Sequence, residues 1–77
     1  MLAITQTEID LVLIKYPAAM PGINEAAHQQ WARWRVICDR ITANRHYRFE
    51  DPQKHALLKM ARFAQDMMGH YNYLTYK

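Results

Sequence analysis

The 77-residue chain has one cysteine, two glycines and three prolines. It therefore has few of the residues that form disulfides, cysteine-ligated metal sites or glycine-rich loops. A single cysteine, Cys38, excludes an intramolecular disulfide and leaves no cysteine pair for a zinc site. Two glycines do not make a glycine-rich phosphate-binding loop. We therefore expect no metal and no cofactor, and we expect stability to come from economical packing or from a partner subunit.

Long apolar runs are also missing. No segment approaches the ~20 apolar residues that cross a bilayer, so we expect no membrane association. The N-terminal segment has no basic start, and Glu8 and Asp10 interrupt its apolar part, which makes it a poor signal peptide. Together with the free cysteine, these features favour a cytoplasmic location.

Helical spacing of apolar residues is what the sequence does contain. Apolar residues make up 51% of the chain, which is typical of a folded domain. Thr5 and Glu8 have the spacing of a capping box, with Ile4 and Ile9 placed for a hydrophobic staple. Pro17 ends the apolar repeat that follows. We predict a helix over 6–16.

Two further helices are indicated by the capping residues at their N-terminal ends. Asn24 is a suitable N-cap for a helix over 25–42. Asp51 can cap a third helix over 52–69 or longer, with Pro52 at its first position. The aromatic segment YNYLTYK follows as a C-terminal tail, flexible or docked. The sequence therefore predicts an all-α fold, a small three-helix domain that spans residues 1–77.

The second and third helices each carry an apolar stripe with alternating spacings of three and four residues, which predicts that they pack together. On the second helix the stripe comprises Ala27, Trp31, Trp34, Cys38 and Ile41. On the third it comprises Leu57, Met60, Ala64, Met67 and Tyr71. We expect both tryptophans to be core residues and not a platform for stacking bases.

Charge is distributed unevenly around the net value of +3. Residues 1–30 carry a net −2, whereas residues 31–48 hold five arginines against one acid, Asp39, a net +4. Arg33 and Arg40 are expected opposite the tryptophan stripe, in line with Val36. The candidate partner-binding or anion-binding residues are Arg33, Arg40, Arg45, Tyr47 and Arg48. Arginine suits both phosphates and carboxylates, so this surface is either a solvated face or a binding patch.

Catalysis is not expected. The four histidines share no metal-binding spacing, and His28 and Cys38 point in different directions on one helix. The connections between helices, about seven and nine residues, are too long for a DNA-binding helix-turn-helix.

We read the chain as a small non-enzymatic interaction protein that binds another macromolecule, as a regulator, adaptor or inhibitor of the size that phages and mobile elements encode. The alternative is a nucleic-acid-binding protein that uses the 33–48 segment on the phosphate backbone, without sequence specificity.

The C-terminal segment offers a second candidate surface. Tyrosine and methionine are enriched at protein interfaces, and this segment is rich in both. The candidate interface residues are Met68, Tyr71, Tyr73, Leu74 and Tyr76. From them we predict a protein partner and a homodimer closed through the third helix and its tail.

Overall fold

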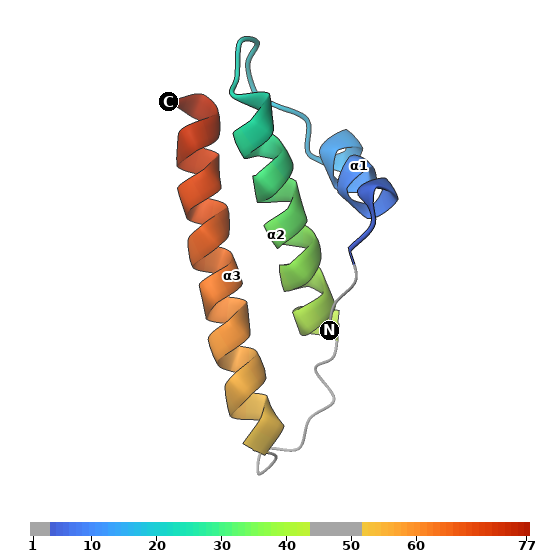
Figure 1. Ribbon diagram of the computed structural model, residues 1–77, viewed down its shortest axis with the longest axis vertical. Coiled ribbons are helices and arrows are strands. Elements are labelled where there is room, and N and C mark those ends of the chain that lie inside the picture. Colours follow the sequence, from blue (N-terminus) through green and yellow to red (C-terminus); the bar gives the residue numbers. More distant parts are fainter. Residues whose placement is uncertain (1–3, 44–51) are drawn as a thin grey trace.

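The structure, a computed structural model, describes residues 4–43 and 52–77. Within these two ranges the chain forms three helices and no strand: α1 (Gln6–Lys15), α2 (Glu25–Ala43) and α3 (Pro52–Tyr76). Figure 1 shows α2 in the centre, with α1 on one side and α3 running antiparallel to α2 on the other. The predicted all-α, three-helix fold is confirmed.

The start and end of α1 follow the sequence signals. The Thr5 hydroxyl accepts a hydrogen bond from the Glu8 N–H at 3.3 Å, as an N-cap residue does. Ile9 is buried and Ile4 is half-buried, as the predicted staple requires. The Tyr16 N–H donates to the Val12 carbonyl at 2.8 Å in the final turn, and Pro17 then prevents continuation.

Asn24 is the N-cap of α2, as predicted. Its side-chain Oδ1 accepts from the Ala27 N–H at 3.2 Å. Gly22, two residues earlier, has a φ of 75°, a backbone conformation that glycine adopts without steric cost. The predicted cap at Asp51 lies outside the residues that the structure describes.

The predicted C-terminal tail is the last part of α3, which runs on to Tyr76. Thr75 is only 2% exposed, and its hydroxyl donates to the Tyr71 carbonyl at 2.6 Å. The Asn24 N–H donates to the Thr75 carbonyl at 3.1 Å, so the start of α2 satisfies a carbonyl that the end of α3 would otherwise leave unpaired. This hydrogen bond docks the last turn beside the α1–α2 loop (Figure 1).

α2 is buried on two opposite faces because a helix packs on each. Ala27, Cys38 and Ile41 are buried on the face toward α3. Ala32 and Val36 are buried on the face toward α1, with 0% and 6% of their surface exposed. The expectation that Val36 belongs to a solvent-facing side was therefore wrong: α1 covers that side.

The predicted stripe on α3 was partly wrong. Met60 is 47% exposed, whereas Ala61 is half-buried. Ala64 is fully covered, which allows α2 and α3 to approach closely. The α3 residues packed toward α2 are Leu57, Ala61, Ala64, Met68, Tyr71 and Thr75.

The two tryptophans are half-buried, not fully buried, and they contact different helices. The Trp34 ring meets Phe63 of α3 edge to face, with centroids 5.4 Å apart. The Trp31 ring stacks on His28 at 5.5 Å and meets Tyr16, at the end of α1, edge to face at 6.1 Å. Aromatic pairs of these geometries are favourable beyond the area that they bury. One predicted stripe thus divides between the α3 and α1 contacts.

Candidate binding surfaces

Arg40 was expected on a solvent-facing side of α2, but it does not project freely into solvent. Its guanidinium donates to the Glu8 carboxylate of α1, and the two side chains are only 30% and 33% exposed. The net charge of +4 over residues 31–48 is therefore partly compensated by an acid from outside that segment. Glu8, 32 residues away in sequence, compensates Arg40 and ties α1 to α2.

Arg35 also holds the end of α1. Its Nε donates to both carboxylate oxygens of Asp39, one helical turn away, at 3.1 and 3.3 Å. Its Nη2 donates to the Tyr16 hydroxyl at 2.9 Å, and the guanidinium lies 4.5 Å from the centre of the Tyr16 ring. Arg35 therefore has a structural use, in which charge and ring stacking fix the end of α1.

The predicted anion-binding patch is not assembled in the part of the chain that the structure describes. Arg33 is exposed on α2, and Arg40 is engaged with Glu8. Arg45, Tyr47 and Arg48 lie outside the described residues.

The candidate interface residues of the C-terminal segment are mostly used within the molecule. Met68, Tyr71, Leu74 and Tyr76 are half-buried, while Tyr73 is 63% exposed. The Tyr76 hydroxyl accepts from the Ala19 N–H of the α1–α2 loop at 3.1 Å. An interface through the whole segment would have to disturb these contacts.

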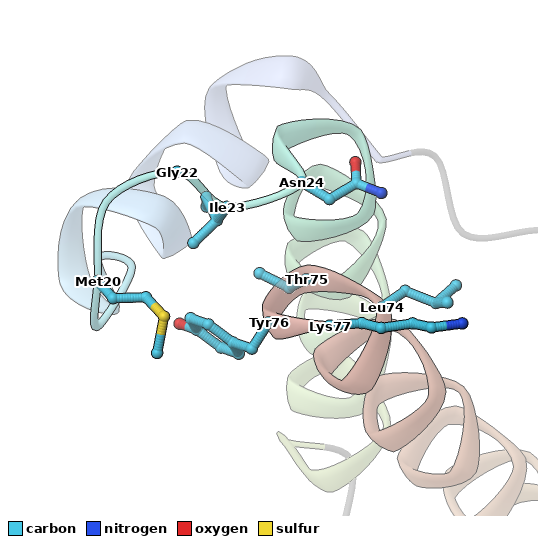
Figure 2. A pocket seen from close by; sticks show the side chains of 8 residues that line it. All are labelled: Met20, Gly22, Ile23, Asn24, Leu74, Thr75, Tyr76 and Lys77. Carbon is cyan, nitrogen blue, oxygen red and sulfur yellow. The ribbon is translucent and has the colours of Figure 1, made fainter.

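A pocket of about 620 Å³ lies between the α1–α2 loop and the end of α3. Figure 2 shows the Tyr76 ring reaching toward the loop and Met20, whereas Leu74 and Lys77 point to the other side of α3. Among its lining residues the only charged side chain is Lys77, and there is no acid, histidine or cysteine. The lining is Met20, Gly22, Ile23, Asn24, Leu74, Thr75, Tyr76 and Lys77. Such a lining offers no acid–base pair.

Within residues 4–43 and 52–77, no group of three histidine, cysteine or acidic side chains is placed to hold a metal ion. The same part of the chain has no helix with the length and apolar character needed to cross a bilayer.

Two exposed large apolar side chains on α1 differ from what the apolar spacing of the sequence predicts. Leu11 and Ile14, on the side of α1 that faces away from α2, are 61% and 76% exposed. We call this pair the α1 outward face. The available signal was the unbroken apolar run from Leu11 to Ile14, which makes a short helix apolar on both sides.

A second exposed apolar set lies on α3, where Met60 is 47% and Phe63 is 56% exposed. It adjoins the line that packs on α2, because the Phe63 ring contacts Trp34.

No protein-family model, curated protein or solved structure matches the chain.

Proposed function

We propose that this is a small non-enzymatic protein that acts by binding another protein, with the α1 outward face as its main contact. The observation that carries the proposal is the exposure of Leu11 and Ile14, at 61% and 76%. A surface helix ordinarily places polar residues away from its core. Exposed apolar side chains that adjoin one another are typical of interaction sites.

The α1 outward face is held in place before any partner arrives. On the inner side of the helix, Ile9 is 6% exposed and packs toward α2. The Glu8–Arg40 ion pair and the Arg35–Tyr16 hydrogen bond fix the two ends of α1. A preorganised surface loses less conformational entropy on binding, which favours affinity.

The chemistry of this surface suits an apolar groove on the partner. Leu11 and Ile14 are three residues apart, the spacing with which a helix anchors itself in such a groove. Exposed Thr7, Asp10 and Lys15 surround them, so the rim is polar and of mixed charge. We propose that the protein works by occupancy, as a regulator, adaptor or inhibitor in the cytoplasm, the kind of role that phage and mobile-element accessory proteins of this size perform.

The alternative, nucleic-acid binding through the arginine-rich segment, has less support. Its favourable observation is that Arg33 is exposed. Against it, Arg35 and Arg40 are directed to Asp39 and Glu8, and a phosphate would have to compete with these carboxylates.

Site-specific photo-crosslinking tests the proposal. A photo-crosslinking amino acid at position 14 should give one discrete crosslinked protein in the cells that make this chain. The same amino acid at exposed Gln65, on α3, should not. If position 14 gives no product, or the same products as position 65, the α1 outward face is not the contact surface.

A further inference from the structure

α3 carries a second apolar stripe beside the line that packs on α2. Successive members are separated by 4, 3, 4, 3 and 4 residues, the heptad spacing with which two helices pack side by side. We call it the α3 outer seam: Ala56, Met60, Phe63, Met67, His70 and Leu74. Its centre is open, since Met60 is 47% and Phe63 is 56% exposed.

Charges of opposite sign flank this seam on the side away from α2. Lys59 and Asp66 are exposed, lie seven residues apart, and immediately precede Met60 and Met67. In the described part of the chain the ion pairs are Arg35–Asp39 and Arg40–Glu8, so Lys59 and Asp66 are not neutralised there. Residues with this spacing occupy the same heptad position in two successive repeats.

From this pattern we propose that a second copy of the chain docks on the α3 outer seam, antiparallel and related by a twofold axis. An antiparallel pair brings the same flank of the two helices together. Lys59 of each copy then faces Asp66 of the other, so the two identical helices are complementary in charge. In the seam, Met60 packs on Phe63 of the second copy, and small Ala56 opposes large Met67.

Other arrangements of the same seam are disfavoured. Sliding the second copy by one heptad sets Asp66 against Asp66 and places Met60 on the polar ring of His70. A parallel pair would direct the Lys59 flank of one copy to the Leu57 and Ala64 flank of the other, which α2 already covers. The pattern therefore specifies both orientation and register.

The proposed homodimer is closed through Met60 and Phe63 and not through the C-terminal tyrosines. It is independent of the function proposed for α1, because the two surfaces share no residue.

Sedimentation velocity of the full chain over a range of concentrations tests the dimer. We expect a reversible monomer–dimer equilibrium. Lys59→Glu should raise the dimer Kd about tenfold, because two attractive pairs per dimer become repulsive. Asp66→Lys should do the same. The double variant, Lys59→Glu with Asp66→Lys, should return the Kd to within about threefold of the original value.

Arg62→Glu is the matched control, since it makes the same change of charge on α3 at an exposed position outside the seam. It should leave the Kd unchanged, as should Leu11→Asp on the α1 outward face. All the substituted side chains are exposed, so far-UV circular dichroism should show a folded chain in every case. A monomer at all concentrations, a double variant that dimerises no better than the single ones, or equal sensitivity to Arg62→Glu would overturn the proposal.

Discussion

Replacing Trp34 with alanine is expected to lower the free energy of unfolding by about 3 kcal/mol, the lower end of the range for truncating a large aromatic residue. The indole is half-buried, and its contact with Phe63 joins α2 to α3. For a domain of this size, such a loss is a large share of the total stability, which is about 4–12 kcal/mol for ordinary proteins of this length. Urea unfolding followed by circular dichroism, at one fixed protein concentration, measures it.

Tyr73→Ala is the control for this prediction, because it removes an aromatic ring of which 63% is exposed. Its effect should stay within about 0.5 kcal/mol, as for most surface substitutions. A loss of under about 1 kcal/mol for Trp34→Ala would show that the α2–α3 seam does not depend on this side chain.

Replacing Ile9 with alanine is expected to cost about 2–4 kcal/mol, since it leaves a cavity where α1 packs on α2. Ile9 is 6% exposed and is the only residue of α1 that is buried to this extent. Because α1 is short, its helical state depends on this packing more than on its own propensity. Thermal unfolding by circular dichroism and urea titration should both report the loss.

Ile14→Ala provides a matched control, with the same chemical change five residues further along the same helix. Ile14 is 76% exposed, so its truncation should be neutral or slightly stabilising, given the higher helix propensity of alanine. Equal losses for the two variants would mean that α1 does not contact α2 through the Ile9 side, and that the α1 outward face is misplaced.

The helices could be predicted from the sequence because their ends are marked by local chemistry. Thr5, Asn24 and Pro52 each act within one turn of the chain, and the observed boundaries fall at these residues. The extension of α3 beyond Gly69 was harder to predict, since glycine weakens a helix and the following tyrosines favour other conformations. What keeps the last turns helical is tertiary: Thr75 is buried, and its carbonyl accepts from Asn24.

The surfaces were less predictable, because they depend on which helix covers which face. Two apolar lines lie side by side on α3, and spacing alone does not tell which one meets α2. Met60 was therefore assigned to the core, although it is 47% exposed. The Glu8–Arg40 pair joins residues 32 apart in sequence, and no local pattern specifies such a pair. The loss of Arg40 from the proposed patch follows from that contact.

Quantitative capture from nuclease-treated lysate of the source cells tests most directly whether this protein acts by binding another protein through α1. We predict that the immobilised full chain retains a specific protein after nuclease treatment. Leu11→Asp should reduce the amount at least about tenfold, the loss expected when a central apolar contact is removed. Leu58→Asp, the same change at a leucine of similar exposure on α3, 57% against 61%, should not. Capture that disappears with nuclease, and that falls with Arg33→Ala but not with Leu11→Asp, would contradict the proposal and favour nucleic-acid binding.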